Sequence, residues 1–131
     1  MIFVDTGAWY ASTVPDDENH QKAQEWLKAN TQPLLTTDYV IDETLTLLKV
    51  RGHAPLALDL GESLFAGELA DIVLITEDDI QQAWQTFRQF HDKDWSFTDC
   101  TSKVVMARLR AAQAFSFDHH FRQFGSIGVV P

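Results

Sequence analysis

Residues 1–7 read Met-Ile-Phe-Val-Asp-Thr-Gly, and the interpretation of the whole chain starts from this stretch. A short apolar run that ends in an acid and a glycine is typical of a buried strand followed by a turn. Residues 114–118, Ala-Phe-Ser-Phe-Asp, repeat the pattern of an apolar strand that ends in an aspartate. We therefore predict two buried strands, each with an acid, Asp5 or Asp118, at its carboxyl end.

The residues between these strands alternate between helical and extended patterns and contain no repeat or linker. Apolar residues at spacings of three and four predict helices, and brief apolar runs predict further strands. Such alternation favours an α/β layer with a mostly parallel sheet, in which ligands bind beyond the carboxyl ends of the strands. The predicted helices span 16–30, 37–51, 55–70, 76–90 and 98–112, further strands span 34–36 and 127–130, and 71–75 is either a strand or a connection.

Polar residues mark where several of these helices begin. Thr37 and Thr98 are predicted N-caps, because a threonine hydroxyl accepts a hydrogen bond from a free backbone N–H of the first turn. Thr76 together with Asp79 resembles a capping box. The acidic runs at 16–18 and 77–79 are interpreted as helix starts that the helix dipole favours.

Size and composition indicate a single domain over residues 1–131. Of the 131 residues, 45% are hydrophobic, including four Trp and nine Phe, which is enough for one core. We expect a cytoplasmic protein without a membrane span, because no apolar run reaches the roughly 20 residues that cross a bilayer and the start has no basic segment. The single cysteine, Cys100, cannot form an internal disulfide.

The formal net charge of −9 argues against nucleic-acid binding through a generally basic surface. A polyanion could still approach if several of the acids hold cations, because a bound metal ion reverses the local charge. The remaining acidic surface would suit a basic partner.

Four acids are candidate site residues, and three of them, Asp5, Asp99 and Glu43, have a simpler interpretation when taken alone. Asp5 and Asp99 can serve as helix caps or favour a helix N-terminus. Glu43 lies three residues after Val40 and four before Leu47, on the apolar face of its predicted helix, so we expect it to point inward. An inward carboxylate is costly unless an arginine or a metal ion neutralises it, and the helix pattern does not distinguish these two.

Taken together, the four acids favour a metal site. Asp5 and Asp118 follow strands, Asp99 begins a helix and Glu43 faces inward, so all four are expected at one edge of the sheet. Carboxylates held close together repel one another and raise their pKa values unless a cation is present. An all-oxygen site selects Mg²⁺ or Mn²⁺, and the chain has no cysteine pair or HExxH motif for zinc.

Four short segments, spread over essentially the whole chain, resemble segments of the PIN-domain family and occur in the same order as in that family. They are residues 1–8, Met-Ile-Phe-Val-Asp-Thr-Gly-Ala, residues 37–43, Thr-Asp-Tyr-Val-Ile-Asp-Glu, residues 96–102, Ser-Phe-Thr-Asp-Cys-Thr-Ser, and residues 116–121, Ser-Phe-Asp-His-His-Phe. The resemblance is closest to the VapC-type toxins of toxin-antitoxin pairs.

This resemblance implies a three-layer α/β/α domain and a Mg²⁺- or Mn²⁺-dependent endoribonuclease that hydrolyses RNA with a metal-activated water. It also implies a small antitoxin partner and a homodimer. Two positions depart from the family pattern: Ser116 stands where threonine is commoner, and Phe117 where a polar residue is frequent. The implied metal ligands are Asp5, Asp99 and Asp118, with Glu43 binding directly or through water, and Thr6 and Ser116 would orient acids or waters.

Other interpretations remain open. A PIN-domain nuclease can process RNA without being a toxin, and an inactive PIN-like domain can bind a partner protein. A Mg²⁺-binding receiver module has a similar length but needs a second acid beside Asp5. Lys103, four residues after Asp99, is either a phosphate contact or part of an intrahelical ion pair. His119 and His120 are not expected to bind the metal, because hard cations prefer oxygen ligands.

Overall fold

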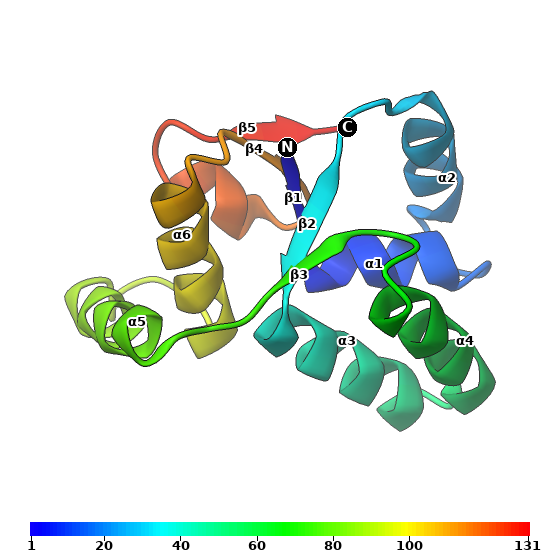
Figure 1. The fold of residues 1–131 in the computed structure, drawn as a ribbon, viewed down its shortest axis with the longest axis horizontal. Helices are drawn as coiled ribbons and strands as arrows, with labels where there is room; N and C mark the ends of the chain where they lie inside the picture. The colour runs from blue at the N-terminus through cyan, green and yellow to red at the C-terminus, as the bar shows by residue number, and fades with distance from the viewer.

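The computed structural model describes all 131 residues and contains one five-stranded sheet flanked by helices (Figure 1). The strand order is β3-β2-β1-β4-β5, and every neighbouring pair is parallel. The predicted α/β architecture is confirmed, with a sheet that is parallel throughout. The strands are β1 (Ile2–Val4), β2 (Leu34–Thr37), β3 (Asp71–Val73), β4 (Gln113–Phe115) and β5 (Gly128–Val130).

Helices cover both faces of the sheet, so the molecule has the three layers that the family resemblance implies. Figure 1 shows α1, α2 and α4 on one side of the sheet and α5 and α6 on the other. No helix is long and apolar enough to cross a membrane. The helices are α1 (Thr6–Thr13), α2 (His20–Ala29), α3 (Asp38–Val50), α4 (Ala54–Phe65), α5 (Glu77–Gln89), α6 (Phe97–Leu109) and the 3-10 helix η1 (His119–Gln123).

The central strand β1 pairs with β2 on one side and with β4 on the other. The chain therefore adds strands in one direction up to β3 and then returns to the opposite side of β1. In open parallel sheets this reversal forms a crevice at the carboxyl ends of the two strands. Val4 is in register with Phe115, the last residue of β4. Ser116 and Phe117, which were predicted to continue this strand, lie beyond it. Asp5 and Ser116 therefore emerge side by side into this crevice.

Aromatic side chains pack the central strands from both faces. Phe3 and Phe115 are fully buried. The ring of Phe115 lies 4.3 Å from that of Trp26 on α2, and the ring of Phe3 lies 6.1 Å from that of Phe121 on η1. Strands covered on both faces are continuously apolar, which is why the first residues of the chain carry so clear a signal.

The largest departure from prediction is α1, which occupies the position of the turn expected after β1. Asp5 is its N-cap and accepts a hydrogen bond of 2.9 Å from the backbone N–H of Ala8. Most of α1 is buried, so its residues show no apolar and polar alternation from which a helix could be predicted. The acidic run at 16–18 is not a helix start either, because α2 begins at His20.

Two other helix ends also differ. The N-cap of α6 is Ser96 rather than Thr98: Ser96 Oγ accepts from the backbone N–H of Asp99, and Asp99 Oδ2 accepts from that of Ser96, both at 3.0 Å. Helix α4 ends at Phe65, earlier than the predicted position 70, and Gly67 follows with a φ of +75° that a helix cannot continue.

Candidate active site

The four candidate acids meet at the carboxyl edge of the sheet. Asp5, Glu43, Asp99 and Asp118 line one pocket of about 150 Å³, together with Thr6. Asp5 follows β1, Glu43 lies in the second turn of α3, Asp99 in the first turn of α6, and Asp118 is the N-cap of η1. Side chains from four separate elements thus converge on one small space.

Asp5 is held by hydrogen bonds at both carboxylate oxygens. Oδ1 accepts from Ala8 N–H at 2.9 Å, and Oδ2 accepts from the Ser116 hydroxyl at 2.6 Å. Burial raises the pKa of Asp5 to about 7, and the charges of Asp118 and Asp99 act in the same direction, while the two donors act against them. Without a cation, burial therefore favours the protonated form of this carboxyl group.

Glu43 has no arginine or lysine within ion-pair distance, so the arginine alternative for this residue is wrong. Burial raises its pKa, and the charges of Asp99 and Asp118 raise it further. The Thr6 hydroxyl faces this carboxylate and lowers the pKa in part. That hydroxyl is itself buried, and no hydrogen bond of ordinary geometry satisfies its oxygen.

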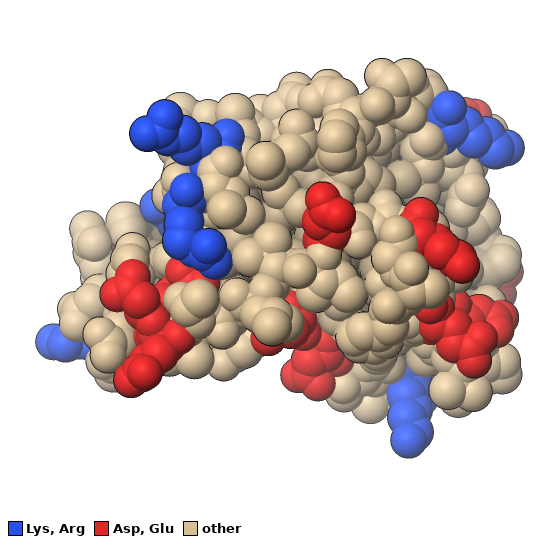
Figure 2. Space-filling model, in the orientation of Figure 1, with Lys and Arg blue, Asp and Glu red and all other residues tan.

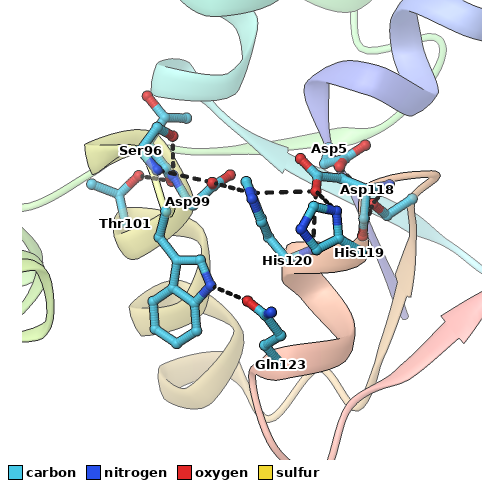
Figure 3. Close-up of polar contacts among 11 residues, drawn as sticks. Asp5, Ser96, Asp99, Thr101, Asp118, His119, His120 and Gln123 are labelled. Atoms are coloured by element: carbon cyan, nitrogen blue, oxygen red, sulfur yellow. Dashed lines mark hydrogen bonds and ion pairs between the residues drawn. The ribbon is translucent and has the colours of Figure 1, made fainter. Parts of the chain in front are cut away.

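The side chain of Asp99 contacts both the N-cap residue of its own helix, α6, and the 3-10 helix η1. Its Oδ2 accepts from Ser96 N–H at 3.0 Å, and His120 Nδ1 lies 3.0 Å from the same oxygen (Figure 3). Burial raises the pKa of Asp99, and so does the charge of Asp118, whereas Ser96 and His120 lower it. The raising effects prevail because no lysine or arginine contacts the carboxylate.

His120 is the residue near the site whose contact the sequence did not predict. Its Nδ1 also lies 3.2 Å from Asp118 Oδ1, which accepts from the backbone N–H of His120 at 2.9 Å. Ligand atoms of Asp118, His119 and His120 all lie within 4.8 Å of one another. Because Nδ1 of His120 faces two carboxylates, which only accept when ionised, we assign the ring hydrogen to this nitrogen, which is then not a metal ligand.

The oxygen atoms of the pocket fit a divalent cation. Asp99 Oδ1, Asp118 Oδ2 and both oxygens of Glu43 accept no hydrogen bond from the protein, and Thr6 Oγ1 is buried without a partner. Oxygen ligands without sulfur or a free imidazole nitrogen are those that Mg²⁺ and Mn²⁺ prefer. A cation would also remove the repulsion that raises the pKa values of these acids.

Basic side chains lie nearby on α6 but do not neutralise the pocket. Figure 2 shows some basic groups over the upper end of α6 and others at the margins of this face, with acidic groups scattered across its middle and lower part. Arg108 pairs with Asp79 of α5 at 2.8 Å and is therefore engaged. Lys103 forms no ion pair with Asp99, so the intrahelical pair considered above is absent.

Comparison with known proteins agrees with this geometry. The model of the PIN domain family matches residues 2–127. The chain is 31% identical to the 23S rRNA-specific endonuclease VapC20 of Mycobacterium tuberculosis, over 100% of this chain and 99% of that protein. A VapC ribonuclease of Archaeoglobus fulgidus is 32% identical over 90 residues, which cover 67% of this chain and 55% of that protein.

Solved structures give the same result. The crystal structure of M. tuberculosis VapC20, described as a sarcin-ricin loop cleaving toxin, matches with a TM-score of 0.93 and 29% identity over the full length of both chains. FitAcB from Neisseria gonorrhoeae has a TM-score of 0.70 at 14% identity, over 100% of this chain and 97% of that chain, and shows the shared fold alone. The chain therefore belongs to the PIN-domain family of nucleases and is homologous to VapC ribonucleases.

Proposed function

We propose that this chain is a Mg²⁺- or Mn²⁺-dependent endoribonuclease and the toxin of a toxin-antitoxin pair. The observation that carries the proposal is the meeting of four carboxylates in one pocket without a lysine or arginine to pair with them. A relative that aligns over the whole chain is named as an endonuclease specific for 23S rRNA, so ribosomal RNA is the first substrate to test.

Asp5, Asp99 and Asp118 would hold the cation, and Glu43 would bind it directly or through water. When bound, the cation lowers the pKa of water and stabilises negative charge on the reacting phosphate. The Ser116 hydroxyl keeps Asp5 in place through its 2.6 Å hydrogen bond. Glu43 has a raised pKa and no lysine or arginine partner, so its carboxylate can accept a proton from the attacking water.

The proposed antitoxin follows from the same pocket, whereas the homodimer is implied by the family resemblance. A small antitoxin with a basic segment would be attracted to the acids and would block access of RNA, and we expect the nuclease to form a homodimer. A receiver module is excluded, because such domains have the strand order 2-1-3-4-5 and this sheet has the order β3-β2-β1-β4-β5. Overproduction without an antitoxin should arrest growth, whereas harmless overproduction of active protein would favour an RNA-processing nuclease.

The direct test is to incubate the purified protein with total cellular RNA, with divalent cation or with a chelator, and to map new 5′ ends. Cation-dependent cuts that leave a 5′-phosphate are expected. Asp5→Asn should abolish them, and Asp42→Asn, which changes an exposed acid next to Glu43, should not. Cuts that persist in the Asp5→Asn protein would remove Asp5 from the mechanism, and absence of cuts in the wild type would favour an inactive interaction domain.

A further inference from the structure

The 3-10 helix η1 presents two pairs of side chains to different surroundings. With three residues per turn, side chains three positions apart lie on the same face. Phe121 and Phe124, whose ring centroids are 4.8 Å apart, form the buried pair. Phe121 stacks on Phe3 of β1, and Phe124 packs against Trp95, just before α6, at 5.0 Å. These contacts anchor η1 between the sheet and the start of α6.

The second pair, His120 and Gln123, faces the start of α6 (Figure 3). His120 Nδ1 lies 3.0 Å from Asp99 Oδ2, and Gln123 Oε1 accepts a hydrogen bond of 2.7 Å from Trp95 Nε1. Trp95 and Asp99 flank Ser96, the N-cap of α6. Two polar contacts, one turn of η1 apart, therefore join this short helix to one end of α6.

The same link determines where Asp118 lies relative to Asp99. Asp118 is the N-cap of η1, and its Oδ1 accepts from the backbone N–H of His120 and lies 3.2 Å from Nδ1 of that residue. In Asp99, Oδ2 is the oxygen that contacts protein donors. Each aspartate thus has one oxygen held by the protein, while Asp99 Oδ1 and Asp118 Oδ2 accept no protein hydrogen bond.

We infer that His120 is a positioning residue, which holds Asp99 and Asp118 at a set separation for a shared cation, and that the Gln123–Trp95 hydrogen bond keeps η1 in place. This inference rests on the metal centre of the proposed function. A carboxylate held through one oxygen has the other oriented in advance, and such outer partners commonly contribute about 10- to 100-fold to metal affinity. His120 acts as a hydrogen-bond donor, which a neutral imidazole also provides, so the role requires no change of charge.

Mn²⁺ affinity, measured by electron paramagnetic resonance above the raised pKa of Asp5, tests the role of His120. His120→Leu removes the donor and should weaken Mn²⁺ binding by about 10- to 100-fold. His120→Asn keeps a side-chain N–H near the place of Nδ1 and should restore most of the affinity. The control is His119→Leu, at an exposed histidine whose Nδ1 lies 3.7 Å from Asp118, and it should bind Mn²⁺ as the wild type does.

Substitution of Gln123 tests the role of its hydrogen bond with Trp95. Gln123→Leu should weaken Mn²⁺ binding by less than His120→Leu does, and Gln123→Glu should not, because a glutamate oxygen still accepts from Trp95. The Trp95 indole N–H gives an independent readout by nuclear magnetic resonance of the metal-free protein. Its hydrogen exchange should be faster in Gln123→Leu than in the wild type, and unchanged in Gln123→Glu.

Equal Mn²⁺ affinity in the wild type and His120→Leu would overturn the inference, and so would an equally large loss in His120→Leu and His120→Asn. Both results are distinct from failure of the proposed function. Wild-type protein that binds no Mn²⁺ would overturn the metal centre itself, together with this inference. Wild-type protein that binds Mn²⁺ but cuts no RNA would overturn the nuclease proposal and leave the positioning role supported by the affinities.

Discussion

The first turns of α5 and α6 contain the same local motif in opposite electrostatic surroundings. In each, an N-cap hydroxyl, Thr76 or Ser96, and an aspartate three residues later exchange hydrogen bonds with backbone N–H groups. Asp79 is fully buried, and Arg108 donates to both of its oxygens at 2.9 and 2.8 Å. Asp99 forms no ion pair with a lysine or an arginine, and it faces the other acids of the pocket.

The two pKa values shift in opposite directions as a result. Burial raises the pKa of Asp79, but the hydrogen bonds and charge of Arg108 outweigh this effect, and the pKa is lowered. Burial also raises the pKa of Asp99, where the neighbouring Asp118 adds to the effect and the pKa stays raised. An aspartate in a capping box is therefore structural where an arginine neutralises it, and available to a cation where none does.

The largest expected effect is a loss of activity on substitution of Asp99, which substitution of Asp79 should not cause. Asp99→Asn should lower kcat on RNA by about 1000-fold, because a ligand charge at the proposed metal centre is lost. The fold should persist, since the asparagine oxygen can still accept from Ser96 N–H. Single-turnover cleavage with saturating Mn²⁺ measures this loss, and thermal unfolding checks the fold. Cleavage close to that of the wild type would show that Asp99 is only a helix cap.

The next effect is the pH dependence of stability without metal. A group whose folded pKa is raised stabilises the protein fully below its unfolded pKa, and this contribution is lost as the pH rises through the folded value. For Asp5 the window runs from 3.8 to about 7, so the chelator-treated protein should lose stability over this range. The loss is on the order of 4 kcal/mol and is measurable by urea unfolding. Asp5→Asn should flatten the profile, and a flat wild-type profile would contradict it.

A smaller effect is expected at Asp79, where substitution should lower stability and leave activity unchanged. Asp79→Asn leaves Arg108 without its charged partner, and the side chain of Arg108 is 38% exposed, so water offsets part of the loss. We expect the free energy of unfolding to fall by about 2 kcal/mol, with kcat unchanged. Urea unfolding and the cleavage assay measure the two quantities. A fall in kcat without a fall in stability would remove the distinction between the two capping boxes.

The smallest expected effect concerns Lys103, which lies one helical turn after Asp99 and is free of ion pairs. If it contacts an RNA phosphate, Lys103→Met should raise KM and lower the slope of log affinity against log salt by about one. Lys22→Met changes a lysine of α2 on the other side of the sheet and should alter neither quantity. Equal KM values for both variants would show that Lys103 does not contact the substrate.

Sequence patterns predicted the continuously apolar central strands and most of the helices, and missed one helix that is largely buried. The capping box and apolar spacing of α5 predicted its start correctly, and Thr37 is indeed the N-cap of α3. Helix α1 was missed because it is largely buried and has no amphipathic period. His120 was considered only as a metal ligand, and its contact with Asp99 depends on a 3-10 turn that the sequence pattern does not reveal.

The sequence by itself determined the short-range features: an acid after an apolar strand, and a hydroxyl paired with an aspartate three residues later at the start of two helices. These depend on residues at small, constant separations, so backbone geometry alone produces them. Only the tertiary structure decided that Asp79 meets Arg108 and that Asp99 meets His120, because these partners lie 29 and 21 residues away. The packing of α5 and η1 on α6 brings them together, and that packing arises from the burial of apolar faces rather than from the aspartates.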